Sequence, residues 1–177
     1  DTRTLLRFQL VADEARKLRA GGDAARRFIA LLRQRGTTVD PTLATFEAMF
    51  TQRDGQPNPS LVAVAEHLPV LWRRGMLGSE MSPTSEQVGR WRESYDSMVA
   101  LVGEMHRAGI RLVAGTDGVP ALILFRELEL YVRAGIPPAQ VLRIATWNGA
   151  RVAGIADRTG SIERGKAVDQ QQVGGFA

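Results

Sequence analysis

The chain has 177 residues, 44% of them hydrophobic and 24% charged, a composition typical of one globular domain that buries a substantial core. Its 23 basic residues exceed its 19 acidic residues, but they are scattered beside acidic ones, which disfavours a nucleic-acid-binding patch. The absence of cysteine excludes disulfides and thiolate metal sites, and no apolar run approaches the ~20 residues that span a membrane.

The N-terminal half of the chain is predicted to be mostly helical, because its apolar residues recur at helical spacing. The predicted helices cover residues 4–18, 23–34, 44–50, 61–68, 70–74 and 86–108. A short strand is expected over residues 39–43, where Pro41 confines it to a strand start, an edge or a bulge. Loops rich in polar residues, Gly and Pro are expected over 51–60 and 75–85.

The segment from Arg111 to Asp117 has the pattern of a short buried strand that ends in a carboxylate. Arg-Leu-Val-Ala is followed by a glycine that stops the strand, so Asp117 stands at its carboxyl end. In α/β proteins, functional side chains usually lie at this position. A helix is expected after Pro120 and ends at Gly135, and Pro137-Pro138 opens another helix.

Five short motifs follow one another in this part of the chain. They are Ala114-Gly-Thr-Asp117, Arg126-Glu-Leu-Glu-Leu130, Ala134-Gly-Ile-Pro137, Ala145-Thr146 with Asn148-Gly-Ala-Arg151, and Gly160-Ser-Ile-Glu-Arg-Gly-Lys166. Together, and in this order, they resemble the C-terminal part of the amidohydrolase superfamily, most closely its imidazolonepropionase-like or prolidase-like metal-dependent hydrolases. Residues 36–43 are similar to the penultimate strand of that family's barrel, so the resemblance covers most of the chain.

The resemblance implies an α/β fold by descent that is dominated by helices. We expect one domain over residues 1–177, a partial TIM-barrel-like fragment that holds the last two β/α units together with additional helices. Family members continue after Gly-Lys with a strand of a small β-domain. Here residues 166–177 lack the aliphatic density of a strand, and an irregular tail is expected there.

The resemblance also implies a chemistry for Asp117. In the family, one or two divalent metals, zinc or similar, activate water for attack on an amide or ester carbon. Asp117 matches the family's aspartate that binds metal and accepts a proton from that water. Four further residues are candidates for substrate binding because they lie beside it, at the end of the preceding strand or on the following helix: Thr116, Gly118, Thr42 and Glu127.

Two departures from the family pattern limit this interpretation. The chain has no His-x-His pair, and a metal that generates hydroxide needs about three protein ligands. Family members often carry a histidine just before the Arg-Glu of the helix, where this chain has Phe125. The sequence therefore predicts either a hydrolase of C–N or ester bonds in a small-molecule substrate, or an incomplete remnant of one.

Each candidate residue also has a purely structural interpretation. Asp117 would cap the helix that starts after Pro120, and the Thr42 hydroxyl would cap nearby backbone. Glu127, between Arg126 and Glu129, would belong to a solvated helix face.

The two histidines suggest a second enzyme hypothesis, a metal-independent esterase in which a serine works with His106 or His67. No Gly-x-Ser-x-Gly elbow is present to support it. His106 near a helix end would interact with the helix dipole, and His67 is expected to be half-buried among apolar neighbours. The three tryptophans are expected in the core: Trp72, Trp91 and Trp147.

A third hypothesis is a non-catalytic helical module that self-associates. Helices that pack on a closed sheet in the family would leave seven apolar residues uncovered here: Leu122, Leu124, Leu128, Val132, Val141, Leu142 and Ile144. We therefore expect a homo-oligomer that has no nucleic-acid or membrane partner. We also expect a soluble protein without a signal peptide, and the sequence indicates no cellular compartment.

Overall fold

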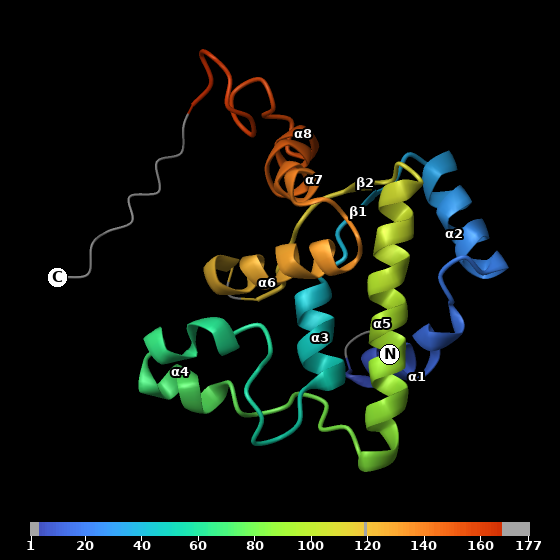
Figure 1. Ribbon diagram of the computed structural model, residues 1–177, viewed down its shortest axis with the longest axis vertical. Helices are drawn as coiled ribbons and strands as arrows, with labels where there is room; N and C mark the ends of the chain where they lie inside the picture. The colour runs from blue at the N-terminus through green and yellow to red at the C-terminus, as the bar shows by residue number, and fades with distance from the viewer. Residues whose placement is uncertain (1–3, 119, 168–177) are drawn as a thin grey trace.

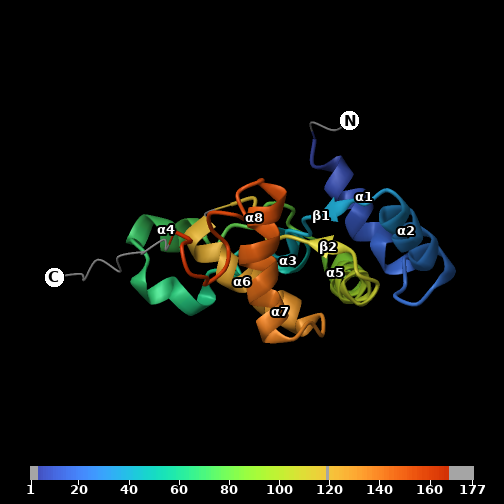
Figure 2. The ribbon, with the colours of Figure 1, turned by 90° about the horizontal axis from the view of Figure 1, so that it is seen from above.

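A two-stranded parallel sheet lies between the N-terminal helices α1 and α2 and the C-terminal helices α6 to α8 (Figure 1, Figure 2). The computed structural model describes residues 4–118 and 120–167. Strand β1 (Thr38–Val39) pairs with strand β2 (Arg111–Leu112). Parallel neighbours need a crossover connection, and residues 40–110, which contain three α-helices, provide it. The predicted α/β fold dominated by helices is confirmed.

The first strand is shorter than predicted, because the backbone turns away from the strand direction by Thr42. Thr42 adopts a left-handed backbone with φ 44°, which ends extended structure before residue 43. Helix α3 (Leu43–Thr51) starts there, so the strand expected over residues 39–43 is wrong beyond Val39. The helix predicted over residues 44–50 is confirmed.

The long helix α5 (Ser85–Arg107) is the spine of the fold and agrees with the prediction to one residue at each end. Thr84 accepts a hydrogen bond from Gln87 N, while the Gln87 side chain accepts one from Thr84 N, which forms a capping box. The helix packs against α1 (Leu6–Glu14), α3 and α6 (Pro120–Arg133).

The N-terminal helices follow the predicted positions. Helix α1 continues into a short 3-10 turn (Ala15–Lys17), and α2 covers Asp23–Gln34. Asp13 ties α1 to α5, because its Oδ1 accepts hydrogen bonds from the Arg90 guanidinium and from Trp91 Nε1 at 2.9 Å. The bond from Trp91 is the main cause that holds the pKa of Asp13 below its usual value.

The connection over residues 52–84 contains a 3-10 turn (Val62–His67) and the short helix α4 (Val70–Gly75). The helix predicted over 61–68 is therefore a tighter turn. Gln52 holds the two ends of this connection together by donating hydrogen bonds to Gln56 O and Met76 O at 3.0 and 2.7 Å.

The C-terminal part turns back onto the strands. Helix α6 is followed by α7 (Pro138–Arg143), a π-helical turn (Ile144–Asn148) and α8 (Gly149–Val152). Asn148 Nδ2 donates to Leu112 O at 2.8 Å, which anchors this segment to β2. Of the tail expected over residues 166–177, positions 168–177 lie outside the described residues. Within the described part of the chain, no helix combines the length and apolarity needed to cross a membrane.

The tryptophans do not share one environment. Trp91 is buried in a chain of aromatic rings with Phe50 and Phe46, as predicted. Trp72 is 47% exposed because it lies on α4, which projects from the body of the molecule (Figure 1). Trp147 is half-buried and packs under the Lys166 ammonium, 4.5 Å from the ring centroid. The expected core position is wrong for Trp72.

The helix faces predicted to be uncovered are partly covered within the chain. Val141 and Ile144 are buried, because α7 packs against α6 and the π-helical turn packs against β2. Val132 and Leu142 remain exposed, at 44% and 60%. The remaining three, Leu122, Leu124 and Leu128, are half-buried. The prediction of uncovered apolar residues is thus wrong for Val141 and Ile144 and confirmed for Val132 and Leu142.

Candidate active site

Two aspartates stand where the parallel strands end, Asp40 after β1 and Asp117 after β2. Asp40 Oδ1 accepts a hydrogen bond from Gly115 N at 2.9 Å, which clamps the loop after β2 to the end of β1. An added Cβ at position 115 would lie 2.0 Å from Asp40 Oδ2, so a larger residue there would displace the Asp40 carboxylate. Sequence reasoning missed Asp40, because the strand predicted over residues 39–43 placed it inside the strand, whereas β1 ends at Val39.

Asp117 has an unusual backbone conformation for a residue with a side chain. Its φ is 43°, in the left-handed region that Asp and Asn tolerate better than most residues, and its side chain is exposed. Thr42, at the corresponding place after β1, is also left-handed, and a β-branched residue is strained there. Both strands therefore end in turns that direct the chain to a new helix.

The start of α3 fixes the loop that carries Asp117. Thr45 Oγ1 donates to Thr116 O at 2.9 Å, one residue before Asp117. The contribution of Thr116 is thus its backbone carbonyl, which orients the loop. Thr42 is buried beside it, but its hydroxyl makes no capping hydrogen bond to α3, so the capping role expected for it is wrong.

A small cavity of about 120 Å³ opens beside Asp117 and Gly118, which both line it. Polar groups from two loops line it as well: Asn58, Ser60 and Glu80. The Ser60 hydroxyl donates to Ala44 O at 3.3 Å, and Asn58 Oδ1 accepts from Ser60 N at 2.9 Å. Of the predicted site residues, the structure brings Asp117 and Gly118 together here. Sequence reasoning missed the loop residues, which no motif marks.

Glu127 is buried, and its predicted place on a solvated helix face is wrong. Its exposure is 0%, and Oε2 accepts a hydrogen bond from Ala44 N at 2.7 Å. Burial raises the pKa of Glu127 and so favours the neutral acid, although the hydrogen bond from Ala44 N acts in the opposite direction. Tyr131 donates its hydroxyl proton to Val113 O at 2.8 Å, and Glu127 Oε1 has no partner among the described residues. Glu127 caps α3 from within the core and does not line the cavity.

An ion pair beside Glu127 joins α3 to α6. Arg126 donates to both carboxylate oxygens of Glu47 at 2.8 Å, and Glu47 is buried. The hydrogen bond from Arg126 to Glu47 is the main cause that raises the pKa of the guanidinium, so Arg126 stays charged. This bidentate pair and the Glu127 cap fix the start of α3 relative to α6.

The two histidines lie away from Asp117. His106 is in the last turn of α5, at the amino end of β2, whereas Asp117 follows its carboxyl end. His67 is exposed on the surface turn before α4, so the expected half-buried position is wrong. Within the described residues, neither histidine hydrogen-bonds a serine or an aspartate. The structure therefore does not bring His106 together with the other candidate catalytic residue.

The described residues do not fit the divalent metal that the family resemblance implies. Residues 4–118 and 120–167 contain no group of three or more His, Cys, Asp or Glu placed to hold a metal ion. A hydroxide-generating metal needs about three such ligands. Asp117 alone does not supply a donor set.

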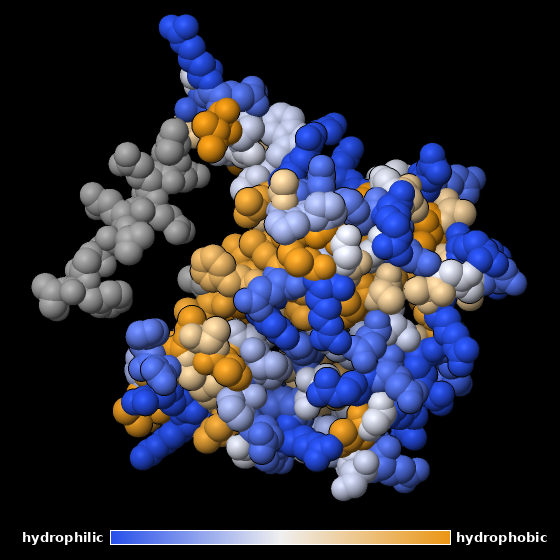
Figure 3. Space-filling model, in the orientation of Figure 1, coloured by the Kyte–Doolittle hydropathy of each residue, from blue (hydrophilic) through white to orange (hydrophobic). Residues whose placement is uncertain are grey.

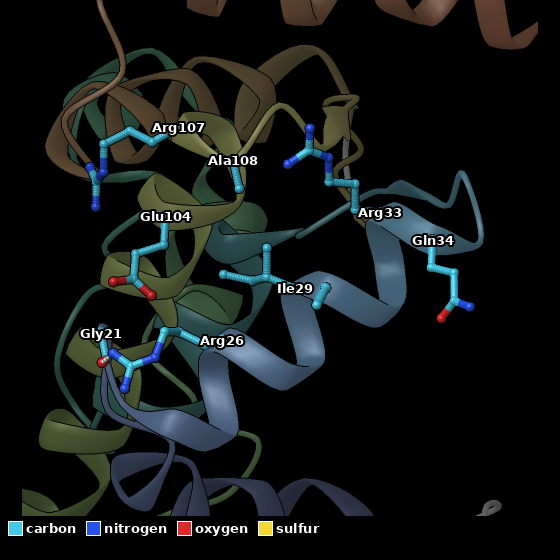
Figure 4. A pocket seen from close by; sticks show the side chains of 9 residues that line it. Gly21, Arg26, Ile29, Arg33, Gln34, Glu104, Arg107 and Ala108 are labelled. Atoms are coloured by element: carbon cyan, nitrogen blue, oxygen red, sulfur yellow. Dashed lines mark hydrogen bonds between the residues drawn. The ribbon is translucent and has the colours of Figure 1, made fainter.

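A larger cavity, about 830 Å³, lies between α2 and α5 (Figure 4). Three arginines and Glu104 line it around the apolar Ile29: Arg26, Arg33 and Arg107. The C-terminal turns of α2 and α5 lead into the amino ends of the strands, so this cavity lies opposite the strand ends that carry Asp40 and Asp117. Because chemistry in α/β folds is placed at the carboxyl ends of strands, the smaller cavity is the better candidate site.

Comparison with known proteins points to one family. A sequence model described as the amidohydrolase family matches residues 14–172. A 5-methylthioadenosine/S-adenosylhomocysteine deaminase of Desulforudis audaxviator (strain MP104C) is 31% identical over 153 residues, which cover 80% of this chain and 31% of that protein. The chain thus spans about a third of the length of this curated relative. No solved structure matches the chain.

Proposed function

Because the chain belongs to the amidohydrolase family, we propose that Asp117 is the catalytic carboxylate of a hydrolase that acts on C–N or ester bonds of small molecules. The observation that carries this proposal is the position of Asp117 in the loop that follows the carboxyl end of β2, on the wall of a cavity lined by polar side chains. The curated relative is named as a deaminase, and deamination breaks a C–N bond.

In this proposal, Asp117 takes a proton from the attacking water and returns it to the leaving nitrogen or oxygen. The loop is held in place for this by two hydrogen bonds, Gly115 N to Asp40 and Thr45 Oγ1 to Thr116 O. In the family, metal supplies Lewis-acid activation of the water. Since the described residues lack the ligand set, the proposal assigns only proton transfer and loop positioning to this chain.

The finer relationships are part of the same proposal. The order of the motifs supports a place in the imidazolonepropionase-like or prolidase-like branch. The two parallel strands with an aspartate at each carboxyl end support a single domain related to the last two β/α units of a barrel. Gly118, on the cavity wall, is the predicted substrate-binding residue best placed for contact. Thr116 and Glu127 instead accept hydrogen bonds from α3 that fix the surrounding backbone, and Thr42 is buried without a side-chain bond to that helix.

The other hypotheses have less support. The esterase hypothesis needs a serine beside His106 or His67, and no such hydrogen bond occurs among the described residues. A self-associating module is supported by exposed apolar side chains such as Leu71, at 78%. Self-association is compatible with catalysis, so this observation does not compete with the role of Asp117.

Replacing Asp117 by Asn tests the proposal. Turnover of a panel of simple acyl amides and esters should be lost, while the melting temperature stays unchanged, because the side chain is exposed and Asn tolerates a left-handed backbone. Asp157→Asn, at an exposed loop aspartate away from the cavity, is the matched control and should keep full activity. Activity that survives in Asp117→Asn would end its catalytic role. Activity of the unaltered chain that survives chelator treatment would favour a metal-independent mechanism.

A further inference from the structure

An apolar groove of about 690 Å³ runs beside the candidate site, between the 3-10 turn before α4 and the first turns of α6. Val62 and Phe125 form its two walls and are 54% and 68% exposed. Ala63, Val64 and Leu122 complete the apolar lining. Apolar side chains gather over α6 on this face of the molecule (Figure 3).

The groove and the Asp117 cavity share a wall. Ser60 lines both, and it is buried at 7% exposure with its hydroxyl bonded to Ala44 O. Two consecutive residues of α6 line the two hollows, Ile123 the cavity and Leu122 the groove. The cavity and the groove are therefore neighbours on either side of Ser60, so a substrate group must extend past Ser60 from a bond held at Asp117 to enter the groove.

The charges at the edge of the groove are already paired with one another. Arg126 donates to Glu129 Oε2 at 2.7 Å and to Glu47 Oε2 at 2.8 Å. Arg126 is thus neutralised by two carboxylates and offers no free cation, which disfavours an anionic group in the groove. The groove also has the size of small-molecule sites, which are ~300–1,000 Å³ and mostly apolar.

We propose that this groove binds an uncharged alkyl or aryl group of the substrate, so that hydrophobic acyl amides or esters are the preferred substrate class. This inference rests on the proposed function of Asp117, since the shared wall makes the groove part of the same site. Phe125 is the main specificity-determining residue, because it is the most exposed of the large apolar side chains along the groove.

Binding of two amides to the 177-residue chain tests this inference without requiring turnover. N-(phenylacetyl)glycinamide and N-acetylglycinamide differ only in the size of the acyl group, and backbone amide shifts of Ser60, Val64 and Phe125 report their binding by NMR. The phenylacetyl compound should bind about 10- to 100-fold more tightly, which is the gain expected from burying one aromatic ring. Phe125→Ser and Val62→Asp, on opposite walls, should each remove this preference.

Val132→Ser is the matched control, because Val132 is an exposed apolar residue of the same helix outside the groove. It should keep the preference, and Asp117→Asn should keep it while losing turnover. Equal binding of the two amides, no binding of either, or an unchanged preference in both groove variants would overturn the inference. Amide shifts that respond to protein dilution instead would show that a second copy of the chain occupies the groove, which also overturns it. If the preference is found without hydrolysis of any amide, the groove inference stands and the proposed function fails.

Discussion

Replacing Glu127 by Leu should destabilise the protein, although it puts an apolar residue of similar size into an apolar site. Glu127 accepts a hydrogen bond from Ala44 N in the first turn of α3, where Thr42 makes no capping bond with its side chain. Leu would leave this N–H buried without an acceptor, which costs about 1–3 kcal/mol. For a domain of this size, each kcal/mol lowers the melting temperature by about 2–4 °C, so a decrease of about 2–12 °C is expected.

Glu127→Gln should cost less than the Leu replacement, because its amide oxygen still accepts from Ala44 N. Comparing the stability of wild type and Glu127→Gln at different pH values also reports on the protonation of Glu127. Burial raises the pKa of Glu127 above its usual value of 4.5, so the folded protein binds this proton more tightly than the unfolded chain does. The resulting stability is fully present below the unfolded pKa and is lost as the pH rises through the folded pKa. Gln does not titrate, so the stability of wild type relative to Glu127→Gln should fall over that range.

Thermal unfolding followed by circular dichroism at about pH 5 and about pH 8 measures both effects. Glu129→Gln is the matched control, since Glu129 lies two positions along the same helix with its side chain 60% exposed. Its stability should stay within about 0.5 kcal/mol of wild type at either pH. The reasoning would be refuted if Glu127→Leu melted with wild type, or if wild type gained stability over Glu127→Gln as the pH rose.

Three further predictions concern the ion pair, the metal and the assembly. Arg126→Ala removes the bidentate partner of buried Glu47 and leaves it Arg133 at 3.9 Å, so it should cost about 2–3 kcal/mol, below the ~3–5 typical of fully buried pairs, because Arg126 is also 28% exposed. Urea unfolding checks this, and Arg133→Ala, which removes an exposed pair with Asp96 and the longer 3.9 Å contact with Glu47, should cost less than about 1 kcal/mol. Elemental analysis of chain purified without chelator should find no stoichiometric zinc, and one equivalent per chain would contradict the ligand count. Light scattering at micromolar concentration should show a dimer or larger assembly, because apolar residues such as Leu71 and Leu142 are exposed, and a monomer at every concentration would contradict it.

Local patterns predicted the long elements well. The ends of α5 were expected to within one residue, because helical periodicity and the Thr84 cap act over a few neighbouring positions. A strand before Asp117 was also readable from the short apolar run, although β2 ends at Leu112 and is shorter than the predicted Arg-Leu-Val-Ala. The first strand was overextended at Thr42, since its left-handed backbone is not favoured by a β-branched residue and leaves no signal in the sequence.

Contacts between distant segments could not be read in this way. Glu127 has the sequence neighbours of a solvated residue, yet it is fully buried because its hydrogen-bond partner lies 83 positions earlier, at Ala44. Ser60 and Glu80 come from separate loops without a motif, and only the packing of the connection against α3 and α6 places them beside Asp117. Periodicity shows that a helix has an apolar face, but it does not show which other element covers that face.

The sequence by itself determined the family motifs, the helical character of the chain and the position of Asp117 after a strand, because these depend on residues close together along the backbone. The tertiary structure alone decided that Glu127 is a buried cap whose pKa is raised by burial, rather than a residue of a solvated face. It also decided that Phe125 faces a groove beside the Asp117 cavity. Burial and the protonation that follows from it are set by the elements that pack around a side chain, and those elements come from distant parts of the chain.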